Sequence, residues 1–327
     1  MASHGVSFDD LYRRSTQYRL WSYTREQLAQ QRREVNEKGC RKVDERLTST
    51  PEVSASSIEK VTMDEEIALI SFHARSIAKL AKFFNMPSQV RATGISFFRK
   101  FYLVNSVMEY HPKLILLTCL FLAAKSENFF ISINSFSKRI PKTTPESILG
   151  LEFEILQSLK FTLMAHHPFR PLYGFFYDIQ NVLGPEVSTK ELGSVYDAAR
   201  NLINEALISD AIYHFTPPQI ALACFKTVNE ELTMKYLNKK FTNVKVEDDV
   251  PKSTDYDTLV SVITECQQVI KDTPNPTKDQ AVMIDKKVQF CVNPSLVLKR
   301  KRDTNEPDDA NKRPRVGAVE GGASTSP

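Results

Sequence analysis

The chain has 327 residues, and its 43 Lys and Arg residues nearly balance its 39 Asp and Glu residues, so the formal net charge is only +4. This mild charge does not indicate direct nucleic-acid binding, and the longest apolar run, residues 114–124, is too short to span a membrane. The five cysteines are widely spaced and lack partners at zinc-ligand spacing, so neither a disulfide framework nor a metal site is implied. We therefore expect a soluble intracellular protein. Glycine is scarce, with only 10 residues, which favours helices joined by short turns.

The N-terminal extension, residues 1–61, is polar and charged. Residues 24–38 are predicted to form a helix, with Thr24 as N-cap and Gln27 three residues later. Trp21 and Leu28 are apolar residues in these charged surroundings, so we expect them to dock this segment on the rest of the protein or on a partner. The Ser, Thr and Pro residues of 48–57 predict a linker.

Residues 62–164 have the pattern of a first bundle of five helices. A capping box at Thr62 opens the first helix, the second follows Pro87, and the third starts at Pro112 and is apolar on all sides, which predicts a central position. A short fourth helix is expected near residues 134–139. The fifth is predicted to run on from Thr144 with four inward-facing residues, namely Ile148, Leu151, Ile155 and Leu159.

The same design recurs in residues 165–271. Ser188 is expected to cap a long helix that reaches about Ile208, and Thr216 with Gln219 forms a capping box before another apolar helix. This apolar helix repeats the one at residues 111–125 at an offset of 105 residues. A repeat of that length indicates a duplicated domain and not a solenoid, whose modules have about 20 to 50 residues.

Residues 272–327 are expected to form a C-terminal extension with one possible short helix, followed by a disordered tail from residue 299. Two basic clusters lie in this tail: Lys299, Arg300, Lys301 and Arg302, and then Lys312, Arg313 and Arg315. Their spacing is typical of a bipartite nuclear import signal, so we expect a nuclear protein. The alternative is a solvated charged tail that no receptor reads.

Signatures of catalysis are missing from the sequence. It contains no glycine-rich phosphate loop, no G-x-S-x-G, no H-E-x-x-H and no kinase catalytic loop. The adjacent His166 and His167 are expected to point in different directions between the two bundles and to serve in the linker. We therefore predict a protein that is not an enzyme and that needs no metal or cofactor.

Four segments resemble the cyclin family, and within it the cyclin H group of the CDK-activating kinase: 15–36, 101–125, 166–179 and 210–223. The resemblance implies an all-α fold of two tandem cyclin-box bundles of five helices each, with an N-terminal helix and a basic C-terminal tail. It also implies a non-catalytic subunit that activates a cyclin-dependent kinase. The family's kinase-binding pair corresponds to Lys125 and Glu152, although on pattern alone each could be an ordinary surface charge.

The resemblance further implies a complex with a cyclin-dependent kinase and a RING-finger assembly factor, which acts with the TFIIH core on the RNA polymerase II tail. Three alternatives stay open: another transcriptional cyclin of the Mediator or elongation type, a kinase-independent promoter factor with the same fold, and an all-helical enzyme. The promoter factor would need a zinc ribbon, and no cysteine pair could build one. The enzyme would need convergent carboxylates.

Overall fold

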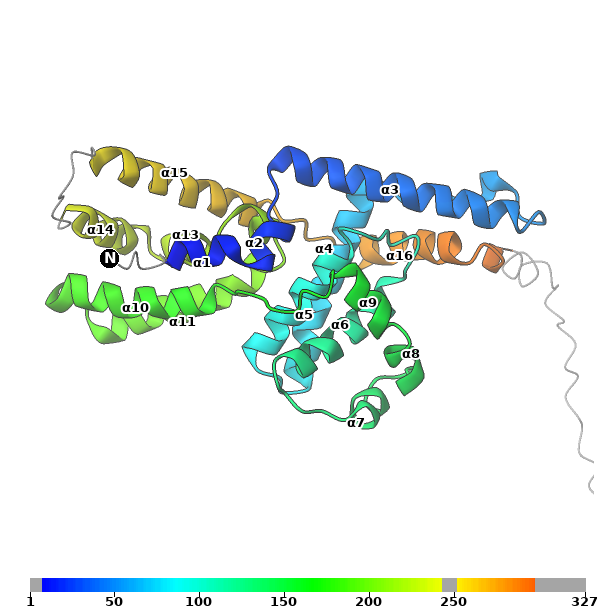
Figure 1. Cartoon of the computed structure of the whole chain (residues 1–327), viewed down its shortest axis with the longest axis horizontal. Helices are drawn as coiled ribbons and strands as arrows, with labels where there is room; N and C mark the ends of the chain where they lie inside the picture. Colours follow the sequence, from blue (N-terminus) through cyan, green and yellow to red (C-terminus); the bar gives the residue numbers. More distant parts are fainter. Residues whose placement is uncertain (1–7, 243–251, 298–327) are drawn as a thin grey trace, which may run out of the picture.

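A computed structural model describes residues 8–242 and 252–297 of the chain. Within these residues the regular structure is entirely helical, and it forms two bundles side by side (Figure 1), which confirms the predicted all-α fold of two tandem cyclin boxes. The basic clusters of residues 299–315 lie outside the described residues. None of the described helices is long and apolar enough to cross a bilayer.

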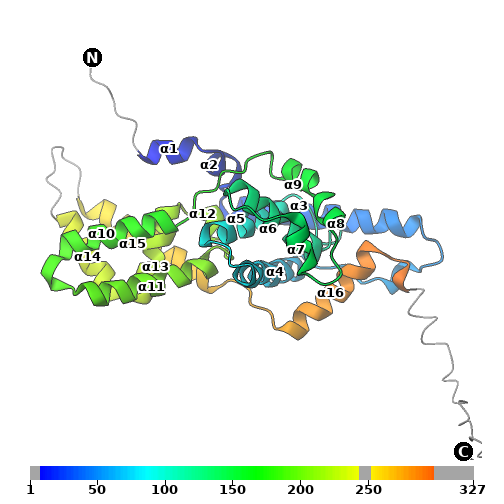
Figure 2. The same ribbon diagram turned by 90° about the horizontal axis from the view of Figure 1, so that it is seen from below.

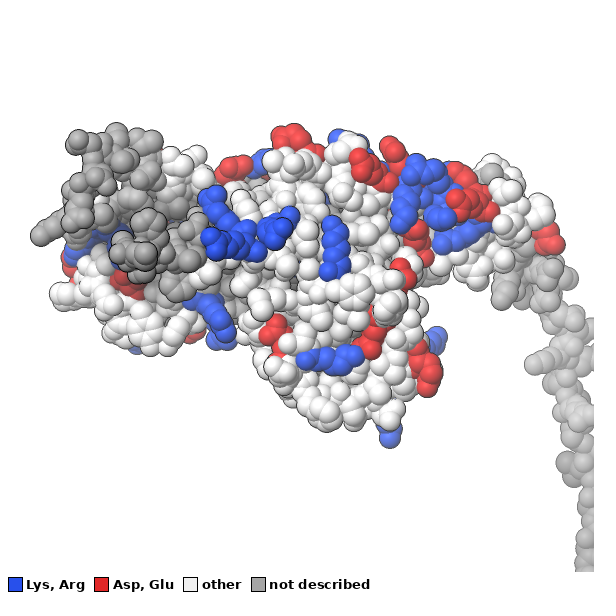
Figure 3. Space-filling model, in the orientation of Figure 1, with Lys and Arg blue, Asp and Glu red and all other residues white. Residues whose placement is uncertain are grey.

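Three helices precede the first bundle: α1 (Phe8–Arg14), α2 (Thr16–Trp21) and α3 (Arg25–Thr48). The capping box of Thr24 and Gln27 is present as predicted. The expected helix end at residue 38 is wrong, because α3 continues ten residues further and places Gly39 against Ser106 of the first bundle. Charged side chains of both signs lie along α3, while Lys and Arg predominate over α2 (Figure 3).

The first bundle contains α4 (Met63–Phe83), α5 (Ser88–Phe101), α6 (Pro112–Ser126), α7 (Ile133–Lys138), α8 (Pro145–Leu149) and α9 (Glu152–Ser158). The α6 helix lies at its centre and packs on α4, α5, α8 and α9, as its all-round apolar sequence predicts. The single fifth helix predicted from Thr144 is wrong. It is broken at Gly150, where glycine favours helix weakly and the N–H of Leu151 bonds to the carbonyl of Ile148 in a tighter turn.

The second bundle contains α10 (Phe169–Leu183), α11 (Thr189–Ala206), the short α12 (Ala211–His214), α13 (Pro217–Val228), α14 (Glu230–Thr242) and α15 (Lys252–Lys271). The predicted N-cap at Ser188 and the capping box at Thr216 are confirmed. The α13 helix is central here and packs on α10, α11, α14 and α15, so it repeats the position of α6 in the first bundle.

The last described helix, α16 (Lys278–Val292), has 15 residues, so the prediction of a short helix is wrong. It returns to the first bundle and packs on α4 (Figure 2). Asp285 holds it there, because its carboxylate lies 2.7 Å from Lys113 Nζ and 3.2 Å from His111 Nε2. The α3 and α16 helices therefore both pack on α4, although they come from opposite ends of the chain.

The close approach of α3 to the first bundle depends on Gly39. A Cβ atom there would lie 2.3 Å from Ser106 Oγ and 2.5 Å from its Cβ, whereas a Cβ at Gly193 in α11 would meet nothing within 4 Å. We expect Gly39→Ala to destabilise the protein by about 1–3 kcal/mol through overpacking. Gly193→Ala should stabilise it by about 0.5–1 kcal/mol through helix propensity. Urea unfolding of both variants measures these changes in the free energy of unfolding, and equal changes for the two variants would contradict the prediction.

Two buried histidines predict acid sensitivity. Burial, and then neighbouring positive charge, lowers the pKa of His167 to about 3, and burial lowers the pKa of His73 to about 4 in spite of Asp285. As the pH falls below about 6.5, the unfolded chain therefore binds protons that the folded chain does not, so stability is lost. We expect the free energy of unfolding to fall by about 1.4 kcal/mol per pH unit for each histidine. Urea titrations from pH 7 to pH 5 should show a shallower slope for His167→Asn, and an unchanged slope would contradict this.

Candidate functional site

Lys125 and Glu152 are brought together by the packing of α6 on α9. Lys125 lies in the last turn of α6, Glu152 is the first residue of α9, and the two form an ion pair. The side chain of Lys125 is 48% exposed and that of Glu152 is 17% exposed, and Lys125 Nζ also lies 5.2 Å from the centre of the Phe121 ring. The pair therefore presents one cation and one anion at the edge of the first bundle.

Exposed apolar side chains lie on α9 and on the segments that flank α6 and α9 in the chain. Phe153 and Phe161 are each 63% exposed, and their ring centroids lie 6.3 Å apart in an edge-to-face arrangement. Leu149 and Phe130 are also exposed. We call Lys125, Phe130, Leu149, Glu152, Phe153 and Phe161 the α6–α9 face. Exposed aromatic groups beside charged anchors are typical of a protein-binding surface.

Sequence reasoning missed the aromatic part of this face, although a signal was present. The buried positions of this region are Ile148, Ile155 and Leu159, and Phe153 does not lie in phase with them. A large aromatic residue outside the apolar phase of an amphipathic helix indicates a surface that a partner covers.

Trp21 and Leu28 are almost completely buried, with 1% and 2% of their surface exposed. They pack in one cluster with Leu103 of the first bundle and Tyr213 of the second. Backbone pairing supports this, because the N–H of Tyr23 donates to the carbonyl of Tyr213 at 3.0 Å. The N-terminal segment therefore contacts both bundles at their junction.

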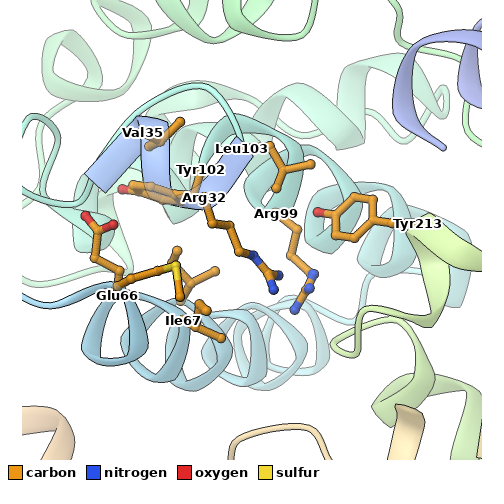
Figure 4. A pocket seen from close by; sticks show the side chains of 10 residues that line it. Arg32, Val35, Glu66, Ile67, Arg99, Tyr102, Leu103 and Tyr213 are labelled. Atoms are coloured by element: carbon orange, nitrogen blue, oxygen red, sulfur yellow. The ribbon is translucent and has the colours of Figure 1, made fainter. Parts of the chain in front are cut away.

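A charged cluster next to α3 joins the N-terminal segment, the first bundle and the second bundle. Arg32 donates two hydrogen bonds to Asp210, at 2.7 and 2.6 Å, and Arg99 donates a third at 2.6 Å. Figure 4 shows the two guanidinium groups side by side, with Tyr213 next to Arg99. Burial alone would raise the pKa of Asp210, but the hydrogen bonds and charges of both arginines outweigh it and hold that pKa far below its usual range. No sequence pattern predicted this cluster, because its members are far apart in the chain.

The two bundles match known domains in order along the chain. Residues 48–164 match the family described as Cyclin, N-terminal domain, and residues 167–271 match the Cyclin C-terminal domain. Together with the all-helical architecture, these matches place the chain among regulatory subunits of protein kinases. The chain belongs to the cyclin family.

Within that family, the chain is similar to Cyclin CCL1 of Saccharomyces cerevisiae, with 39% identity over 94% of this chain and 87% of that protein. It also resembles a chain in the structure of the CAK complex from Chaetomium thermophilum bound to ATP-gamma-S (TM-score 0.78, 30% identity, 96% of this chain and 99% of that one). A chain of the yeast TFIIK (Kin28/Ccl1/Tfb3) complex has a TM-score of 0.65 and 41% identity, over 79% of this chain and 100% of that one. Relatives named cyclin-H are among the matches too, which confirms the resemblance drawn from the sequence.

Proposed function

We propose that this chain is the cyclin subunit of a CDK-activating kinase of the TFIIK type, and that it binds and activates a cyclin-dependent kinase without catalysing phosphotransfer itself. The main support is its similarity to Cyclin CCL1 over 94% of its length, together with its likeness to chains of two CAK and TFIIK assemblies. The Kin28 and Tfb3 chains of the yeast complex suggest the partners: a kinase of the Kin28 type and a Tfb3-like factor in the role of the RING-finger assembly factor.

Activation in this proposal is positional. A protein kinase is active when a Glu of its regulatory helix pairs with its phosphate-binding Lys, and a rigid helical surface packed on that helix can hold it in place. The α6–α9 face has the required parts: an apolar area to bury and two charged anchors. Lys125 and Glu152 would exchange their mutual ion pair for backbone groups that flank the kinase helix.

Reconstitution tests this function. We expect no phosphotransfer to a polymerase-tail peptide from the purified chain alone, and activity when the kinase subunit of the same source is added. A mixture of the kinase with a chain that carries both Phe153→Ala and Phe161→Ala should show much weaker activation. Phosphotransfer by the chain alone, or no activation of the kinase by the wild-type chain, would contradict the proposal.

The same comparisons support a proposal about the wider assembly. We infer association with the TFIIH core and a nuclear location, with the basic clusters of residues 299–302 and 312–315 as the import signal. We also propose that the chain is divided into residues 1–61, 62–164, 165–271 and 272–327.

A cyclin of the Mediator or elongation type is the second candidate function. Identification of the kinase that co-purifies from the source organism separates the two candidates.

A further inference from the structure

The α2 helix lies against the segment that leaves the α6–α9 face. After α9 the chain continues through residues 159–166, which we call the exit segment, before it enters the second bundle at α10. Trp21 Nε1 donates a hydrogen bond to Thr162 Oγ1 at 3.0 Å. Gln17 bonds to both backbone groups of His166: its Nε2 donates to the carbonyl at 3.1 Å, and its Oε1 accepts from the N–H at 2.7 Å. Two side chains of one short helix therefore fix both ends of a five-residue stretch.

The backbone of the exit segment is strained where it presents Phe161. Lys160 and Phe161 have φ angles of 53° and 56°, in the left-handed region that non-glycine residues rarely adopt. The N–H groups of Lys160 and Phe161 bond to the carbonyls of Gln157 and Leu156, both at 2.9 Å, which is the Schellman pattern that usually has glycine at the first of these positions. Such a conformation persists only when surrounding structure holds it.

Trp21 supplies that support from directly beside the strained residues. Its ring is almost fully buried, and the ammonium groups of Lys160 and Lys100 lie 5.3 and 5.4 Å from the centre of the ring. The hydroxyl of Thr162, which accepts the indole hydrogen bond, itself donates to the carbonyl of Leu159 at 2.7 Å. One continuous set of contacts therefore runs from Trp21 through Thr162 to the turn that carries Phe161, and from there to the Phe153 ring next to Glu152.

We propose that α2 acts as a strap on the exit segment, and that Trp21 and Gln17 are positioning residues that hold the Phe153–Phe161 aromatic pair ready for the kinase. This inference rests on the proposed function of the α6–α9 face. Without the strap the strained turn relaxes and the aromatic pair becomes mobile, so the kinase must order it on binding. The contribution of α2 is thus to preorganise the surface, without touching the kinase through Trp21.

A double-mutant cycle on kinase affinity tests the strap. Trp21→Phe keeps a ring but loses the indole N–H, and Thr162→Val keeps the shape but loses the hydroxyl. We expect each substitution to weaken binding of the full-length chain to the kinase about three- to tenfold, the typical effect of one lost hydrogen bond. Because both remove the same bond, the double variant should have the same affinity as the single variant with the larger loss. Gln31→Ala is the control, because Gln31 fixes α3 to Leu103 of the same bundle without touching the exit segment.

The single tryptophan of the chain gives a second readout that does not depend on affinity. In free protein labelled with 5-fluorotryptophan, Thr162→Val should shift the one fluorine resonance, because Thr162 accepts the indole hydrogen bond. Wild-type affinity of the single variants, additive losses in the cycle, or a fluorine resonance that Thr162→Val leaves unchanged would overturn the strap. If Lys125→Ala still weakens binding in that case, the α6–α9 face stands and only the strap fails. If Lys125→Ala and Glu152→Ala also bind normally, the anchor assignment fails as well, whereas the proposed function fails only if the wild-type chain does not activate the kinase.

Discussion

Replacing Asp210 by alanine is expected to destabilise the protein by about 3 kcal/mol, the lower end of the cost of removing one partner from a buried ion pair, because Asp210 is 29% and Arg32 16% exposed. Arg99 is only 4% exposed, and its charge and that of Arg32 would then lie side by side without a counter-charge. Because the cluster joins α3 and both bundles, the unfolding transition should also become less cooperative. The measurement is urea unfolding followed by circular dichroism.

The matched control is an exposed pair that also joins the N-terminal segment to the second bundle. Arg25 and Glu265 lie 2.7 Å apart, with about half of each side chain exposed. Arg25→Ala should therefore cost less than about 1 kcal/mol. A loss for Asp210→Ala as small as that for Arg25→Ala would show that the buried cluster does not hold the bundles together.

Replacing Lys125 or Glu152 by alanine is expected to weaken kinase binding by about 2–5 kcal/mol, or roughly 30- to 5,000-fold, mostly through faster dissociation. Each truncation leaves polar groups of the kinase unpaired in a desolvated interface. The isolated chain should lose less than about 1 kcal/mol, because the lysine side chain of the pair is half exposed. Titration of the kinase with each variant, next to its melting temperature, measures both effects.

Lys239→Ala provides the comparison for that experiment. Lys239 is about as exposed as Lys125 and forms an ion pair with Glu186 at 2.6 Å, but on the second bundle. Its removal should leave kinase affinity unchanged. A chain in which Lys125→Ala and Lys239→Ala behave alike would show that the anchor assignment is wrong.

The fold was largely predictable from local signals. Helix starts were predicted well because Thr24, Thr62 and Thr216 satisfy free backbone N–H groups within three residues of themselves, and such contacts are visible in the sequence. Helix ends and the break at Gly150 were predicted poorly. The length of α3 depends on contacts distant in sequence, such as that between Gly39 and Ser106. The break at Gly150 is local, but one glycine inside an apolar pattern does not by itself indicate a helix end.

The candidate site was predictable only in part. Lys125 and Glu152 were assigned through the cyclin resemblance, since their charges alone do not distinguish them from other surface residues. The turn at Lys160 could not be predicted, because lysine, unlike glycine, does not indicate a left-handed backbone conformation. The Arg32–Asp210–Arg99 cluster joins residues up to 178 positions apart, so only the folded structure reveals it.

Hydrogen–deuterium exchange of the full-length chain, with and without its kinase, tests the central claim most directly. If the α6–α9 face binds the kinase, amide protection should increase in residues 121–130 and 149–161, and the outer helices α14 and α15 of the second bundle should exchange as in the free chain. Protection confined to the second bundle, with residues 149–161 unchanged, would contradict the account.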